Sequence, residues 1–179
     1  SLESLFSNLQ AILPKISTQD VIDTRADYSD LRLSDVDIDL IAKMVAAEAG
    51  NQSLDGQAAV AAVILNRLKA EGFPNTVEGV LYQKNQFSSV ANGSFDRAVP
   101  TKENYEAVLR ALSGYDPTGG ATYFMNPRLA SSGGAGWQER NTQVYTQIGD
   151  HQFRGTEAPR TVARPIVELP PATKKSSPL

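Results

Sequence analysis

The sequence predicts an α+β fold in a single domain, with a helical core followed by a small β-sheet or hairpin. Apolar residues recur every three or four positions over much of residues 37–112, which is the period of amphipathic helices. After Pro117 the pattern changes to short β-branched and aromatic runs bounded by glycines, which is typical of strands. At 179 residues and 41% hydrophobic content, the chain is long enough for one buried core.

Residues 1–36 are predicted to form an acidic N-terminal extension. Residues 1–40 contain eight acidic and three basic residues, whereas residues 41–155 contain ten of each. Apolar residues in the extension follow helical spacing and predict a short helix. We expect this helix to dock on the chain's own domain, with a protein partner as the alternative. The apolar residues are Leu2, Leu5, Phe6, Leu9, Ile12 and Leu13.

A glutamate interrupts the apolar stripe of the first helix expected in the domain, over residues 37–49. Ile38, Ile41 and Val45 step by three and four, and the next position on that stripe is Glu48. Burial there would raise the carboxyl pKa, as a general acid working near neutral pH requires. Glu48 is therefore the catalytic candidate, and a helix-end glutamate that turns into solvent is the alternative.

Three further helices are expected from their N-caps. Ser53 precedes a helix that is apolar on nearly every side over residues 58–68, which predicts the buried centre of the domain. Thr76 precedes a short helix, and Thr101 precedes residues 102–112. At the end of the central helix, Arg67 suits a structural role better than a place in the site.

Two short segments, residues 121–125 and 143–148, predict strands. The glycine-rich residues 131–136 between them predict either a loop that moves over a cleft or a plain hairpin connection. Residues 156–179 hold five of the ten prolines and four basic residues, without any period. They predict a Pro-rich basic tail that is disordered, or that serves as a linker or contacts an anionic surface.

The run from Ala47 to Arg67 resembles the signature of the SleB-like cell-wall hydrolases, the family of the spore-cortex-lytic enzymes. One departure concerns residues 48–52, where that family usually reads Glu-Ala-Arg-Gly-Glu and this chain reads Glu-Ala-Gly-Asn-Gln. Gln52 replaces the second carboxylate, whose role is therefore in doubt here, while Glu48 is intact. Further matches follow in the same order, so that the resemblance covers residues 37–154: residues 72–76, 82–88, 115–121, 123–127, Trp137 and residues 148–153.

The residue types that the chain lacks argue against some classes of hydrolytic site. A catalytic zinc site needs about three protein ligands, and the chain has one histidine and no cysteine, so we expect no metal and no cofactor. A two-carboxylate glycosidase needs a second acid, and Asp55 and Asp96 fall in cap or loop positions. The remaining arrangement is a site with a single catalytic carboxyl, that of Glu48. It can protonate a glycosidic oxygen and then take a proton from a sugar hydroxyl that attacks the same carbon.

The resemblance implies the same reaction. It implies a lysozyme-like fold for residues 37–155, with the sheet lining a substrate cleft, and a peptidoglycan lytic transglycosylase that cleaves the MurNAc–GlcNAc β-1,4 bond and leaves 1,6-anhydromuramyl ends. Glu48 is the residue carried over as catalytic. Several other matched residues have amides, hydroxyls or aromatic faces that suit a glycan groove, although Phe87 and Trp137 equally fit a core and His151 a structural hydrogen bond. These substrate-binding candidates are Gln86, Phe87, Ser88, Tyr123, Asn126, Trp137 and His151.

Two other functions stay open: a hydrolytic muramidase that uses a distant aspartate with Glu48, and a non-catalytic wall-binding or virion-associated module. The expected partner is the peptidoglycan glycan strand, with a protein partner through the extension or tail. A net charge of -3 argues against nucleic acid, and no run reaches the ~18 apolar residues of a membrane span. No signal peptide is visible, and the expected location is the cell envelope, exported or periplasmic, or a phage-like particle.

Overall fold

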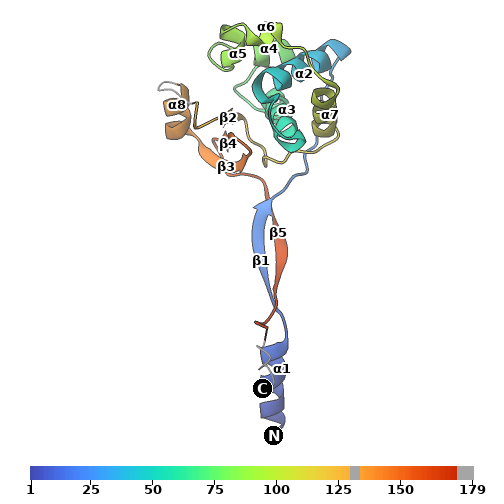
Figure 1. The fold of residues 1–179 in the computed structure, drawn as a ribbon, viewed down its shortest axis with the longest axis vertical. Coiled ribbons are helices and arrows are strands. Elements are labelled where there is room, and N and C mark those ends of the chain that lie inside the picture. The colour runs from blue at the N-terminus through green and yellow to red at the C-terminus, as the bar shows by residue number, and fades with distance from the viewer. Residues whose placement is uncertain (130–133, 173–179) are drawn as a thin grey trace, which may run out of the picture. The chain divides into compact units, whose positions relative to one another are not determined.

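The structure, a computed structural model, describes residues 1–129 and 134–172 and divides them between two compact units. The larger unit holds residues 22–160. The smaller unit combines residues 1–21 with the C-terminal residues from Thr161 onward. Figure 1 shows the order of the elements along the chain.

The helices of the larger unit surround α3, as the apolar residues on nearly every side of residues 58–68 predicted. Residues 58–65 of α3 are fully buried, and α2, α4 and α7 pack against it (Figure 1). Ser53 caps α3 by accepting a hydrogen bond from the backbone of Gly56, and Ser34 and Thr101 close capping boxes on α2 and α7. The helices are α2 (Asp35–Ala49), α3 (Leu54–Lys69), α4 (Val77–Leu81), α5 (Ser88–Ala91), α6 (Ser94–Arg97), α7 (Lys102–Leu112) and α8 (Gly134–Asn141).

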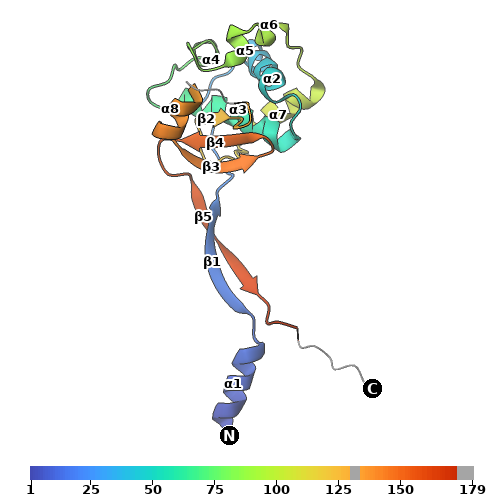
Figure 2. The ribbon, with the colours of Figure 1, turned by 60° about the vertical axis from the view of Figure 1, so that its left-hand side comes forward.

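An antiparallel sheet completes the larger unit, in the order β2-β4-β3 (Figure 2). Strands β2 (Tyr123–Met125) and β3 (Gln143–Ile148) occupy the two segments that the sequence predicted. The central strand β4 (His151–Gly155) was not predicted. Four of its five residues are buried, so it lacks the alternation that marks a half-buried strand.

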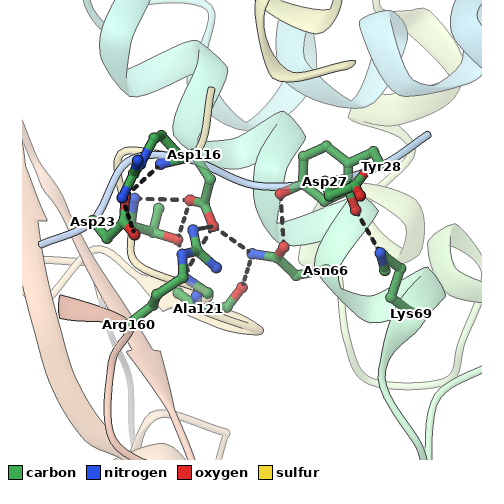
Figure 3. A network of polar contacts seen from close by, with 11 residues as sticks. Asp23, Asp27, Tyr28, Asn66, Lys69, Asp116, Ala121 and Arg160 are labelled. Carbon is green, nitrogen blue, oxygen red and sulfur yellow. Dashed lines mark hydrogen bonds and ion pairs between the residues drawn. The ribbon is translucent and has the colours of Figure 1, made fainter. Parts of the chain in front are cut away.

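A buried aspartate ties the ends of the larger unit together (Figure 3). Asp116 is fully buried and accepts hydrogen bonds from the backbone of Thr118 and Gly120, from the Asn66 amide and from Arg160. Several donors of this kind offset the cost of burying a carboxylate. The network therefore fixes the end of α3 to the segment that leads into β2 and to the residue where this unit ends.

The expected domain boundaries at residues 37 and 155 are too narrow. Tyr28 is 5% exposed, packs in the core and donates a hydrogen bond to Asn66 at 2.7 Å. The backbone of Asp23 bonds to that of Arg160 at 2.9 Å. These contacts join residues 38 and 137 positions apart in the sequence, which helical and strand periods do not reveal.

The smaller unit consists of α1 (Leu2–Ile12) and a two-stranded sheet of β1 (Lys15–Ile22) and β5 (Thr161–Glu168). Helix α1 forms where the apolar spacing predicted one. The expectation of a tail without regular structure is wrong over residues 161–168, because their β-branched residues pair with a strand distant in sequence. Residues 173–179 of that tail lie outside the described residues. Among those described, no helix is long and apolar enough to cross a membrane.

Candidate active site

Glu48 lies in the last turn of α2 and is half-buried. The predicted apolar stripe of α2 is confirmed, since Ile41 and Val45 are fully buried and Ile38 packs on the core. Its Oε1 accepts a hydrogen bond from the Ser89 hydroxyl at 2.7 Å. The carboxyl is thus held at one oxygen while the residue keeps part of its surface accessible.

Ser89 is the partner that the sequence did not reveal. It lies on α5, is 3% exposed, and its hydroxyl also contacts the sulfur of Met44 at 3.5 Å. The predicted neighbour Ser88 is exposed. Ser88 ends the matched block of residues 82–88 and Ser89 follows it directly, so the resemblance pointed to this segment. Only the orientation of the four-residue helix α5 decides which serine points at Glu48.

Four of the predicted substrate-binding residues fall in one aromatic cluster. Phe87 packs on Phe124 with ring centroids 6.1 Å apart, and Phe124 packs on His151 at 5.1 Å. Tyr123, on the same strand β2, packs on Trp137 of α8 at 5.4 Å. Strands β2 and β4 carry three rings of this cluster, and Phe87 and Trp137 join it from outside the sheet.

Exposure separates the members of this cluster. Trp137 is 44% exposed and Tyr123 is half-buried, so both offer aromatic surface to a ligand. Phe87 is buried and belongs to the hydrophobic core, which favours the core alternative for this residue. Phe124 was not among the predicted residues, although it stands next to Tyr123.

Arg67 lies between Phe87 and Tyr123 and contacts both rings of the aromatic cluster. Its guanidinium lies 5.0–5.2 Å from the ring centroids of Phe73, Phe87 and Tyr123, and its Nε donates to the Thr122 carbonyl at 2.7 Å. Burial lowers the pKa of Arg67 to about 10, which still lies well above 7, so the guanidinium is charged at neutral pH and can interact with the ring faces. The residue holds β2 against α3, which agrees with the structural role expected for it.

His151 is a buried member of the sheet. Its ring packs edge-on against Phe124 and Phe153, and among the described residues its Nδ1 has no hydrogen-bond partner. Burial lowers the pKa of the imidazole, so the ring is neutral at pH 7. Among the described residues the ring is held by aromatic packing, and at Nδ1 the structural hydrogen bond suggested by the sequence is not formed.

The remaining polar candidates lie on turns. The Asn126 side chain accepts a hydrogen bond from the backbone of Arg128 at 3.0 Å and so closes the turn that follows β2. Gln86 is half-buried just before Phe87. Residues 131–133 of the glycine-rich segment lie outside the described residues, and residues 134–136 begin α8.

Gln52 links the loop after α2 to the turn between β3 and β4. Its amide nitrogen donates to the Asp150 carboxylate at 2.8 Å, and its amide oxygen accepts from the Asp150 backbone at 3.1 Å. Gly149 makes room for this contact, because a side chain there would collide with the Gln52 oxygen and its φ is +57°. A glutamate at this position would lack the donor that Asp150 uses.

No second acid is engaged with Glu48 by a hydrogen bond within residues 1–129 and 134–172. Asp55 is exposed and accepts from the Tyr115 hydroxyl at 3.1 Å, and Asp96 is exposed on α6. Over the same residues, no group of three or more histidine or acidic side chains could hold a metal ion. Within the described residues, the hydrogen bond found for the Glu48 carboxyl is the one from Ser89.

Solved structures share this fold. The catalytic domain of the germination-specific lytic transglycosylase SleB from Bacillus anthracis superposes with a TM-score of 0.61 and 40% sequence identity, covering 69% of this chain and 97% of that one. The catalytic domain of Bacillus cereus SleB gives the same TM-score and identity over 69% and 93%. The helical core and small sheet therefore have the architecture of a SleB catalytic domain.

Sequence comparisons give the family. The cell wall hydrolase profile matches residues 51–154, and the chain belongs to this family. A spore cortex-lytic enzyme of Oceanobacillus iheyensis is 45% identical over 117 residues, which are 65% of this chain and 41% of that protein. One from Bacillus subtilis is 42% identical over 120 residues, 67% and 38% of the two chains. The match thus spans less than half the length of these enzymes.

Proposed function

We propose that this chain is a peptidoglycan lytic transglycosylase that acts outside the cytoplasm on the MurNAc–GlcNAc β-1,4 bond. The observation that carries this proposal is the Glu48 carboxyl, half-buried at the end of α2 and held by Ser89. Membership of the cell wall hydrolase family and the likeness to SleB catalytic domains support the substrate.

Glu48 acts twice in the proposed reaction. As the acid it donates its proton to the glycosidic oxygen, and the bond from that oxygen to the muramyl anomeric carbon breaks. As the carboxylate it then accepts the proton of the muramyl 6-hydroxyl, whose oxygen bonds to the same carbon. The products are a free GlcNAc 4-hydroxyl and a 1,6-anhydromuramyl end. The reaction therefore consumes no water and needs no second carboxylate.

The glycan strand is proposed to lie along the accessible part of the aromatic cluster. Tyr123 and Trp137 offer ring faces to sugar C–H surfaces, and Ser88, Gln86 and Asn126 offer polar groups at the adjoining turns. Arg67 and the buried rings beneath them keep these surfaces in place.

Digestion of purified sacculi tests the proposal. Wild-type protein should release muropeptides that end in anhydromuramic acid, and Glu48→Gln should lower the rate by about 10²–10⁴-fold, because glutamine cannot donate or accept the proton. Asp55→Asn and Asp96→Asn are matched controls and should keep wild-type rates.

Mass spectrometry of the products decides between the remaining functions. Products with reducing ends, heavier by one water, would identify a hydrolytic muramidase. Binding to sacculi without release of muropeptides would identify a non-catalytic module. A Glu48→Gln protein that still makes anhydro ends at the wild-type rate would place the acid elsewhere.

A further inference from the structure

Helix α1 carries an apolar face that no residue of its own unit covers. Its apolar residues are 43–73% exposed, and none of its residues is buried in the described part of the chain. Leu2, Leu5, Leu9 and Ile12 are spaced three, four and three apart, which places them at positions a and d of a heptad. Phe6 and Leu13 occupy the adjoining e positions. These six residues are the α1 face.

The unit that contains α1 lacks a core of its own. Over residues 1–21 and 161–172, no side chain is buried. A helix of 11 residues and a two-stranded sheet are each marginally stable in water when alone. A partner that covers the α1 face would supply the missing burial.

We propose that the α1 face binds the same face of other copies of this chain and forms a bundle of three or more helices. The heptad spacing makes the face self-complementary. Glu3 is the one charged residue of α1 and lies at position b, away from the face, so no charge repels a second copy. Because the e positions are also apolar, a two-helix seam would leave part of the face uncovered.

The charge pattern also distinguishes this partner from a lipid surface. Helices that lie on anionic membranes carry lysine or arginine on their polar face, and α1 has neither. Its polar side consists of serine, asparagine and glutamine beside Glu3. Contact with other copies therefore fits α1 better than contact with a membrane.

Sedimentation velocity of the full chain tests the proposal. Wild-type protein at micromolar concentration should have three or more times the 19.3 kDa mass of one chain. The double variant Leu5→Asp, Leu9→Asp should sediment as a monomer, because two carboxylates per copy would have to be buried. The matched control Ser7→Asp, Gln10→Asp adds the same charge at positions f and b and should stay oligomeric.

Each other outcome would overturn the proposal. A wild-type monomer would show that α1 does not self-associate, and an oligomer that survives in Leu5→Asp, Leu9→Asp would place the interface elsewhere. A wild-type monomer that floats with phosphatidylcholine vesicles, while the Leu5→Asp, Leu9→Asp variant does not, would assign the face to a lipid surface. An unchanged thermal midpoint of the larger unit shows that either variant is folded.

Discussion

At the scale of single residues, the proposed site centres on the Glu48 carboxyl and the Ser89 hydroxyl that donates to it. The place of Glu48 after the buried residues of α2 could be predicted, because it depends only on the period of one helix. Ser89 could not be predicted. Its contact with Glu48 joins residues 41 apart in sequence, and it depends on how α5 is oriented against the end of α2.

We expect Ser89→Ala to lower kcat by about tenfold with little change in KM. The hydroxyl orients a carboxyl that reacts, and loss of one hydrogen bond to a charged or reacting group costs about 1.5 kcal/mol, which is about tenfold in rate. Ser88→Ala, at the exposed neighbouring position proposed to contact the glycan, should instead raise KM and leave kcat unchanged. A Ser89→Ala protein with wild-type kcat in the sacculus assay would show that Ser89 is a packing residue only.

At the scale of elements, the contact of Gln52 with Asp150 couples the loop between α2 and α3 to the β3–β4 turn. The sequence showed that the second carboxylate of the family is replaced at this position. Only the structure shows what the replacement accomplishes, because its partner Asp150 lies 98 residues away.

We expect Gln52→Glu to destabilise the fold by about 1 kcal/mol at pH 7, because two partly solvated carboxylates would then face each other. Repulsion raises the pKa of one of them in the folded state. The destabilisation is therefore present above that pKa and is relieved as the pH falls through it. Urea unfolding of Gln52→Glu and wild type at several pH values measures this difference.

The control variant is Gln52→Ala, which removes both hydrogen bonds to Asp150 without adding charge. Its cost should not depend on the protonation of residue 52. If Gln52→Glu loses no more stability than Gln52→Ala at pH 7 and does not recover in acid, the repulsion is absent and the contact with Asp150 is not maintained in solution.

At the scale of the whole molecule, the larger unit closes through contacts between its two ends. Residues 22–34 contribute Tyr28 to the core, and Arg160 contributes a donor to the buried Asp116 (Figure 3). Burial raises the pKa of the Tyr28 hydroxyl, which accordingly stays neutral and donates to Asn66. The folding unit is therefore longer at both ends than the periodic part of the sequence.

We expect a fragment of residues 22–160 to unfold cooperatively and a fragment of residues 37–155 to be far less stable. Loss of a buried aromatic side chain alone costs about 3–5 kcal/mol, a large part of the stability of an ordinary domain. Thermal unfolding followed by circular dichroism compares the two. Equal midpoints for both fragments would show that the contacts of Tyr28 and Arg160 contribute little.

The sequence by itself determined the features that depend on neighbouring residues. The capped helices, the buried α3, the strands β2 and β3 and the position of Glu48 all follow from local periods and caps. Tertiary structure alone decided the contact of Ser89 with Glu48, the central place of β4 and the pairing of β5 with β1. The physical reason is that hydrogen bonds and burial between distant segments depend on the packing of the whole chain, and no local period records that packing.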